Sequence, residues 1–155
     1  PKPRLFIIGA VHIAQALVSL ADVADYEIIL IDPRDHFATK DRFPNCKIIN
    51  EWPDEALAKF NLDNSSHLVT LTHDPKIDDL ALIFCMKKNI GYIGSLGSKK
   101  THNKRCERLI EKGFNEIELS KIHAPIGLDI KAKTPAEIAT SILAEIINYR
   151  RNNHD

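Results

Sequence analysis

The sequence predicts a Rossmann-like, doubly wound α/β fold with a mostly parallel sheet and helices on both faces. Two observations carry this prediction. Short, almost entirely apolar segments alternate with amphipathic helical patterns, and the first of these segments runs through a glycine into a helical pattern. Uninterrupted apolar runs are typical of strands that are buried on both faces of a parallel sheet. Right-handed crossovers between such strands place helices on both sides of the sheet.

The strand predictions follow the apolar segments in chain order. Each predicted strand is short, apolar and bounded by polar or turn-forming residues, as buried parallel strands are. The segment 122–133, which carries proline and glycine, is expected to form a loop inside the domain. The five predicted strands cover residues 5–8, 28–31, 47–49, 68–71 and 92–93.

The helix predictions rest on apolar stripes and on start signals. Residues 13–21 carry an apolar stripe at helical spacing, and a Trp-Pro pair opens a short helix over residues 53–60. Residues 99–112 form a basic helical pattern with six Lys and Arg side chains. In the helix that follows the fourth strand, Asp78 and Asp79 are expected to be solvated carboxylates.

Two helices have predicted N-terminal caps. Asp74 followed by proline is typical of an N-cap and the first helical position. Thr134 opens a capping box with a glutamate three residues later, so the longest helix begins there. We expect the domain to span residues 1–150 and the polar tail 151–155 to be disordered.

The turn after the first strand is similar to the dinucleotide-binding fingerprint G-x-G-x-x-G/A. Gly9 fits the first glycine, and Ala14 fits the last small position, where the helix packs close to the sheet. Val11 stands where the middle glycine lets the backbone approach a pyrophosphate. The pattern therefore favours the fold, while Val11 argues against ordinary NAD binding.

Composition argues against several functional classes. Lys and Arg number 21, as do Asp and Glu, and the net charge of zero argues against a general nucleic-acid binder. No apolar run approaches the roughly 20 residues that span a bilayer. The three cysteines form no C-x-x-C pair, which suits a reducing compartment and predicts a cytoplasmic protein. No His or Cys spacing predicts a metal site.

The candidate site is formed by residues that follow the strands, because open parallel sheets bind ligands beyond the carboxyl ends of their strands. Asp32 follows Gly9 by 23 residues, close to the spacing of an acid that holds a ribose 2′-hydroxyl. Arg34 beside it is suited to a phosphate. His12 lies in the first turn of the first helix, near any phosphate bound there.

The fourth and fifth strands lead into two further groups. His73 stands where a strand gives way to a helix and is a candidate ligand or acid–base group, beside the expected cap Asp74. The segment 94–101 leads into the basic helix, and backbone N–H groups at a helix N-terminus favour phosphate. Its candidate contacts are Ser95, Gly97, Ser98 and Lys99.

Several sequence blocks, in their order along the chain, resemble those of a known family, the xanthine dehydrogenase accessory factors of the XdhC/CoxI family. The whole chain is similar to the C-terminal Rossmann domain of that family, which usually reads G-A-G-H where this chain has Gly9-Ala10-Val11-His12. The most specific blocks are Thr72-His73-Asp74-Pro75-Lys76, Gly94-Ser95-Leu96-Gly97-Ser98 and His123-Ala124-Pro125-Ile126-Gly127-Leu128-Asp129-Ile130.

The resemblance implies a cofactor-binding chaperone rather than a turnover enzyme. Such factors bind molybdopterin in the form of the molybdenum cofactor, protect it during sulfuration and help to insert it into a xanthine dehydrogenase-type molybdenum hydroxylase. The implied partner is the apo-enzyme, with a cysteine desulfurase as a further candidate partner and a homodimer as a candidate assembly. The expected cofactor-binding residues are Gly9, His12, Asp32, Arg34, His73, Asp74, Ser95, Gly97, Ser98 and Lys99, and no catalytic residue is assigned.

Two alternatives remain open from the sequence. One is an NAD(P)-dependent oxidoreductase in which Asp32 and Arg34 select the ribose side of the nucleotide. The other is a Rossmann interaction module that has lost nucleotide binding, which Val11 favours.

Overall fold

The fold is built on one six-stranded parallel sheet, and the computed structural model describes residues 2–153. The strand order is β3-β2-β1-β4-β5-β6, so the winding of the chain reverses between β1 and β4. The predicted doubly wound fold class is confirmed. The strands are β1 (Arg4–Ile8), β2 (Glu27–Ile31), β3 (Lys47–Ile49), β4 (Ser66–Thr70), β5 (Tyr92–Ser95) and β6 (Ile122–His123).

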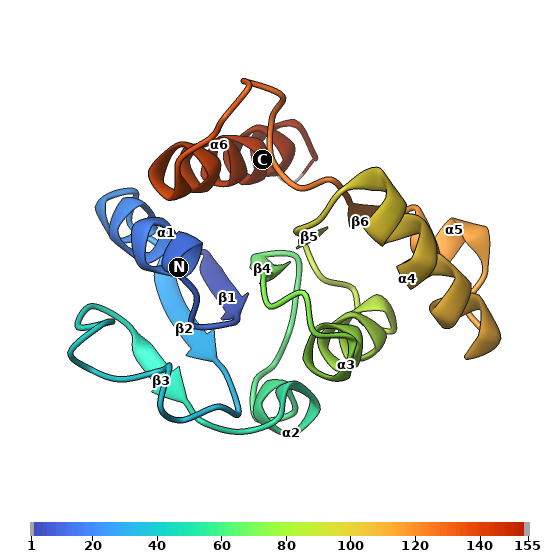
Figure 1. The fold of residues 1–155 in the computed structure, drawn as a ribbon, viewed down its shortest axis with the longest axis horizontal. Helices are drawn as coiled ribbons and strands as arrows, with labels where there is room; N and C mark the ends of the chain where they lie inside the picture. Colours follow the sequence, from blue (N-terminus) through green and yellow to red (C-terminus); the bar gives the residue numbers. More distant parts are fainter. Residues whose placement is uncertain (1, 154–155) are drawn as a thin grey trace.

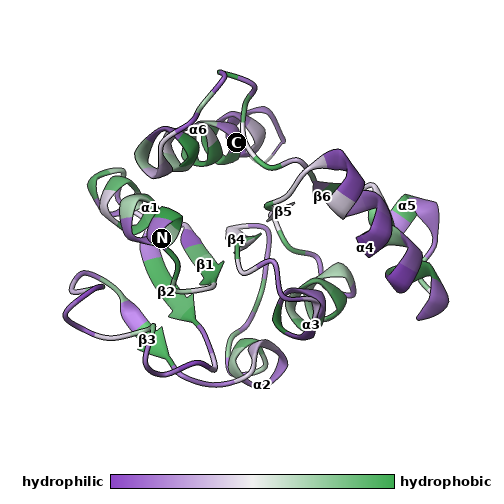
Figure 2. Ribbon diagram, viewed as in Figure 1, coloured by the Kyte–Doolittle hydropathy of each residue, from purple (hydrophilic) through white to green (hydrophobic). Residues whose placement is uncertain are grey.

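Helices cover both faces of the sheet (Figure 1). One face carries α1 (His12–Val23) and α6 (Pro135–Asn153), which pack against each other. The opposite face carries α2 (Pro53–Leu57), α3 (Pro75–Met86), α4 (Lys99–Glu111) and α5 (Glu116–Leu119). Figure 2 shows hydrophobic residues along the strands and the inner sides of the helices, while α4 is largely hydrophilic.

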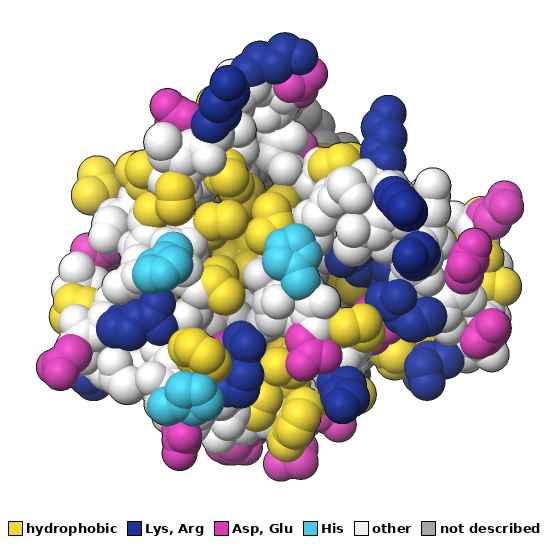
Figure 3. All heavy atoms as spheres, in the orientation of Figure 1, with side chains coloured by type: hydrophobic (Ala, Val, Ile, Leu, Met, Phe, Trp, Pro, Cys, Tyr) yellow, Lys and Arg dark blue, Asp and Glu magenta, His cyan; other side chains and the backbone are white. Residues whose placement is uncertain are grey.

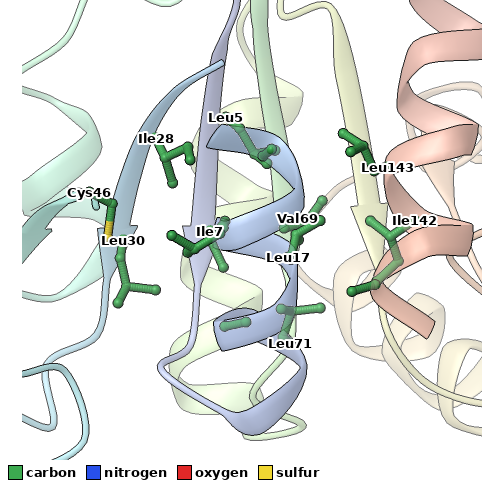
Figure 4. Packing of buried hydrophobic residues seen from close by; sticks show 14 of the residues in the cluster. Leu5, Ile7, Leu17, Ile28, Leu30, Cys46, Val69, Leu71, Ile142 and Leu143 are labelled. Atoms are coloured by element: carbon green, nitrogen blue, oxygen red, sulfur yellow. The ribbon is translucent and has the colours of Figure 1, made fainter. Parts of the chain in front are cut away.

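Side-chain alternation along the central strand β1 divides the core into two layers. Leu5 and Ile7 point toward α1 and α6, where Leu17 belongs to the same cluster (Figure 4). Phe6 and Ile8 belong to the cluster on the opposite face. All five side chains are fully buried, and burying one large apolar side chain contributes about 1.5–3 kcal/mol. The central strand therefore fixes both helical layers and the position of the turn that follows it.

Several element boundaries differ from the sequence-based predictions. β6 lies inside the segment 122–133 that was expected to be a loop, and it adds a sixth strand beside β5. The short helix α5 was not predicted; Asn115 opens it with a reciprocal capping box. The first part of the expected 94–101 loop belongs to β5, which runs to Ser95.

The C-terminal ends of two helices also differ from the predictions. α2 ends at Leu57, before the predicted residue 60, whereas α6 continues through Asn153. Residues 151–153 of the expected disordered tail are therefore helical, and residues 154–155 lie outside the described part of the chain. Within residues 2–153, no helix has both the length and the apolar character needed to cross a membrane.

Candidate functional site

The predicted site residues lie at one edge of the sheet, beyond the carboxyl ends of the strands. Gly9 follows β1, Asp32 follows β2, His73 follows β4, and Ser98 follows β5 at the start of α4. Because all strands are parallel, these positions share one edge, as the sequence predicted. Figure 3 shows this face, where histidine and basic side chains surround a central group of hydrophobic side chains.

The turn after β1 requires glycine at its first position. Gly9 has a φ of +115°, and a Cβ there would lie 2.7 Å from Thr72 Cγ2. Its N–H donates to the carbonyl of Ile31 at 3.0 Å, which ties the turn to β2. Gly9 therefore allows the first turn to pack directly against the loop after β4, at the switch point where doubly wound folds bind ligands.

Asp32 is fully buried and holds two neighbouring segments together. Its Oδ2 accepts the Ala10 N–H at 2.9 Å and Arg34 Nη2 at 2.8 Å, while Oδ1 accepts the Arg34 N–H and Nε, each at 2.9 Å. Burial alone would raise the pKa of Asp32, but the hydrogen bonds from Arg34 and Ala10 outweigh burial and lower the pKa. Both carboxylate oxygens therefore hold Arg34 in place, and Oδ2 also holds the first turn through the Ala10 N–H. A contact between Asp32 and a ribose stays a prediction.

Arg34 and Arg42 line a pocket of about 420 Å³ beside the N-terminus of α1. Arg34 Cζ lies 4.8 Å from the centre of the Phe37 ring, which forms one wall. Arg42 Nη1 donates to the carbonyls of Ala10 and Phe37 at 2.8 and 2.6 Å. All of these acceptors are neutral, and within residues 2–153 Arg42 forms no ion pair. Its positive charge is therefore not paired with a carboxylate of the described residues.

The N-terminus of α1 opens into the same pocket. Val11 is the N-cap residue and makes no side-chain cap hydrogen bond, and its side chain lines the pocket together with the exposed His12. The first N–H groups of a helix lack intrahelical acceptors and carry partial positive charge. The pocket thus combines a helix N-terminus, a guanidinium and a histidine, a donor set suited to an anion.

His73 lies on a strained loop that a buried carboxylate stabilises. Its φ is +65°, which is uncommon for a residue other than glycine, and its side chain is exposed. The His73 N–H donates to Asp78 Oδ2 at 3.0 Å, and Thr72 Oγ1 donates to Asp78 Oδ1 at 2.6 Å. Burial raises the pKa of Asp78 to about 6, against the opposing effect of these donors.

Asp78 and Asp79 are not solvated, and the expectation that they are was wrong. Asp78 is 2% exposed and Asp79 is 6% exposed. Asp79 accepts two hydrogen bonds from Arg108 of α4, at 2.8 and 3.2 Å. Helix α4 packs against α3 and covers the face of α3 that was expected from the sequence to be exposed to solvent. Asp74, in contrast, is the N-cap of α3 as predicted and accepts the Lys76 N–H at 3.0 Å.

The residues after β5 separate into buried and exposed groups. Ser95 is fully buried, and its hydroxyl lies 2.6 Å from the Thr70 hydroxyl, so it joins β5 to β4. Ser98 is the N-cap of α4 and accepts the Thr101 N–H at 3.1 Å. Gly97 has a φ of +136°, and Lys99 is exposed at the first helical position. Of this set, Ser98 and Lys99 present side chains to the edge, and their binding roles stay predictions.

Two residues of the site were not predicted from the sequence. Arg42 lies in an irregular segment without a motif, and only its contact with Ala10, 32 residues earlier, reveals its role. Asp78 had a detectable signal, because an acid in the first turn of a helix often accepts N–H groups from the preceding loop.

Comparisons with known proteins agree on one family. A family model described as the XdhC Rossmann domain matches residues 5–146. A Bacillus subtilis (strain 168) protein, named as a probable xanthine dehydrogenase subunit, is 34% identical over 152 residues, which cover 97% of this chain and 44% of that protein. The "Molybdenum cofactor insertion chaperone PaoD" of Escherichia coli (strain K12) is 30% identical over 155 residues, which cover 100% of this chain and 42% of that protein.

One solved structure agrees with this assignment, and a second shares only the fold. A crystal structure described as a xanthine dehydrogenase from Bacillus halodurans superposes with a TM-score of 0.86 at 32% identity, covering 100% of this chain and 44% of that one. A UDP-glucose 4-epimerase from Thermotoga maritima matches at a TM-score of 0.50 and 13% identity over 96% of this chain and 51% of that one, and it shares the fold alone. The chain spans less than half the length of its curated relatives named above. Because the family model covers most of its length, this chain belongs to the XdhC family through its Rossmann domain.

Proposed function

We propose that this domain binds the molybdenum cofactor at the carboxyl edge of its sheet, as part of an accessory factor for a molybdenum hydroxylase. The observation that carries the proposal is the pocket beside α1, where Arg42 forms no ion pair with any described residue and lies next to a helix N-terminus without a side-chain cap. The proposal is supported by the name of the Escherichia coli relative, a molybdenum cofactor insertion chaperone.

The residues of the pocket fit an anionic cargo. Molybdopterin carries a phosphate, and the α1 N-terminus, Arg42 and His12 supply N–H donors and positive charge for it. Arg34, held in place by Asp32, adds a planar face beside Phe37. The bound cofactor supplies the molybdenum chemistry, while the chain contributes binding, orientation and shielding from water. In this role the domain delivers cargo and does not turn over a substrate.

The geometry weighs against the oxidoreductase alternative. A ribose hydroxyl needs a free carboxylate oxygen at the end of β2, and within the described residues both oxygens of the Asp32 carboxylate already accept hydrogen bonds, from Arg34 and the Ala10 N–H. The Val11 side chain also lines the pocket where a pyrophosphate would approach the backbone. We therefore place NAD(P) second as a ligand.

The proposed partners follow from the proposed cargo. We infer that the cofactor passes to the apo form of a xanthine dehydrogenase-type hydroxylase in the cytoplasm after sulfuration. A cysteine desulfurase would supply the sulfur for that step, and a homodimer would present two such sites. The name of the Bacillus subtilis relative supports the hydroxylase as the partner class.

Titration of the purified chain with molybdenum cofactor, NAD⁺ and NADP⁺ in separate experiments tests the proposal. We expect saturable binding of the cofactor, weakened at least about tenfold by Arg42→Gln because one charged donor is lost. Lys121→Gln is the matched control, since it removes one exposed positive charge at the opposite end of the strands. Tighter binding of NAD⁺ or NADP⁺ would support the oxidoreductase, and binding of none of the three would support the interaction module.

A further inference from the structure

A second pocket lies at the same edge of the sheet, next to the loop between β6 and α6. Its volume is about 460 Å³, and apolar side chains form most of its lining. Leu96 follows β5, Leu128 and Ile130 belong to the loop, and Ile138 belongs to α6. Lys99, at the first position of α4, contributes a positive charge to the lining.

The loop that forms this pocket is anchored at three successive residues. Its backbone N–H groups donate from Ile126 to the Ser95 carbonyl at 3.2 Å, and from Leu128 to the Ser141 carbonyl at 3.1 Å. Between them, the Gly127 N–H donates to Glu145 Oε1 at 3.2 Å. Gly127 has a φ of +95°, and a Cβ there would lie 2.4 Å from Ser141 Oγ. The pocket is therefore preformed, as small-molecule sites usually are.

The anchored loop holds apolar side chains at the surface. Leu128 is 40% exposed and Ile130 is 51% exposed, although both belong to the anchored loop. Three charged residues line the pocket: Asp129 and Lys131 pair with each other at 3.8 Å, and Lys99 adds a positive charge. An anchored apolar surface with this positive charge at its border suits a flat, uncharged ring whose substituent is anionic.

The spacing of the two pockets sets the length of such a ligand. The nearest lining residues of the two pockets follow β1 in one case and β5 in the other, and β4 is the single strand between these two strands. Two strand spacings amount to about 10 Å. Val11 from the first pocket and Leu96 and Ile138 from the second pack against the same core cluster. Figure 3 shows hydrophobic side chains gathered in the middle of this face.

We propose that the loop pocket binds the pterin ring of the cargo while the phosphate occupies the pocket beside α1. The ligand class is thus a planar heterocycle joined by a short linker to a phosphate about 10 Å away. This inference rests on the proposed function and adds the orientation of the cargo: the ring lies beyond the end of β5, and the anion lies beyond the end of β1.

The test uses two probes on the purified chain. The first is a pterin that carries a phosphate on a short side chain, followed by its fluorescence, and the second is inorganic phosphate as its competitor. Ile130→Glu places a carboxylate at the apolar wall and should weaken the pterin phosphate at least about tenfold. The affinity for inorganic phosphate should stay within about twofold of wild type, because the anion pocket is unchanged.

Ile110→Glu is the matched control, because Ile110 on α4 is also 51% exposed and does not line the pocket. Equal effects of the two substitutions on the pterin phosphate would overturn the inference. Equal weakening of both probes by Ile130→Glu would also overturn it.

The two proposals fail in distinguishable ways. If Arg42→Gln weakens the pterin phosphate while Ile130→Glu does not, the anion site stands and the ring orientation is wrong. If the wild-type chain binds neither probe, both proposals are wrong. If Ile130→Glu instead abolishes only binding to a hydroxylase apo-enzyme, the loop pocket is a protein-docking surface.

Discussion

Replacing Asp32 by Asn tests whether this carboxylate is a structural support or a ligand contact. The substitution keeps the size of the side chain but replaces one acceptor oxygen by an NH₂ group. With the NH₂ at the Oδ2 position, two donors lose their acceptor, the Ala10 N–H and Arg34 Nη2. Ala10 is 1% exposed, so its N–H would remain buried without a partner.

The magnitude follows from the burial of each donor. A buried N–H left without an acceptor costs about 1–3 kcal/mol. The Arg34 side chain is 31% exposed and can be hydrated, so its lost ion pair adds only about 0.5–1 kcal/mol. We therefore expect Asp32→Asn to lower the free energy of unfolding by about 3 kcal/mol, which corresponds to a Tm decrease of about 6–12 °C.

Thermal unfolding followed by circular dichroism measures this effect. Asp35→Asn is the matched control, because the Asp35 side chain is 87% exposed in the same segment, and we expect its Tm to equal that of wild type. If Asp32→Asn unfolds at the same temperature as the control but loses nucleotide affinity, Asp32 acts as a ribose ligand and the structural role is refuted.

Three further predictions concern the turn after β1 and the loop after β4. Val11→Gly should strengthen the binding of pyrophosphate-bearing ligands, because it removes a side chain from the pocket beside α1; equal affinities in a titration with a dinucleotide would place the phosphate elsewhere. Gly9→Ala should destabilise the fold by about 1–3 kcal/mol because of its φ of +115° and the clash with Thr72, and unchanged denaturant unfolding would contradict this. Burial raises the pKa of Asp78 to about 6, so the folded state binds this proton more tightly than the unfolded state does. The free energy of unfolding of wild type therefore falls by up to about 3 kcal/mol from this group as the pH rises from 4 to 6. Asp78→Asn removes this titration, so the unfolding free energy of the variant should rise relative to that of wild type between pH 4 and pH 6. A difference between the two proteins that does not change with pH in denaturant unfolding would refute the raised pKa.

Local signals in the sequence were enough to predict most of the fold. The apolar runs located five of the six strands, and Asp74 with its following proline marked the start of α3 correctly. β6 escaped because it has two residues and stands beside a proline-bearing loop. Its pairing with β5 depends on tertiary contacts that no periodic pattern reveals.

The candidate site was predictable in position but only partly in chemistry. The rule that ligands bind beyond the strand ends placed Gly9, Asp32 and His73 on one edge correctly. It could not show that Asp32 is fully buried, because Arg34 and the Ala10 N–H cover it only after folding. The burial of Asp78 likewise depends on packing between elements that are distant in sequence.

A crystal structure of the purified chain with bound molybdenum cofactor tests the central claim most directly. We predict the phosphate within hydrogen-bond distance of Arg42 and the first N–H groups of α1, with the pterin ring over the loop after β6. Cofactor bound at the amino ends of the strands, in the pocket of about 300 Å³ lined by Lys88 and Tyr92, would contradict the claim that the carboxyl edge is the binding site.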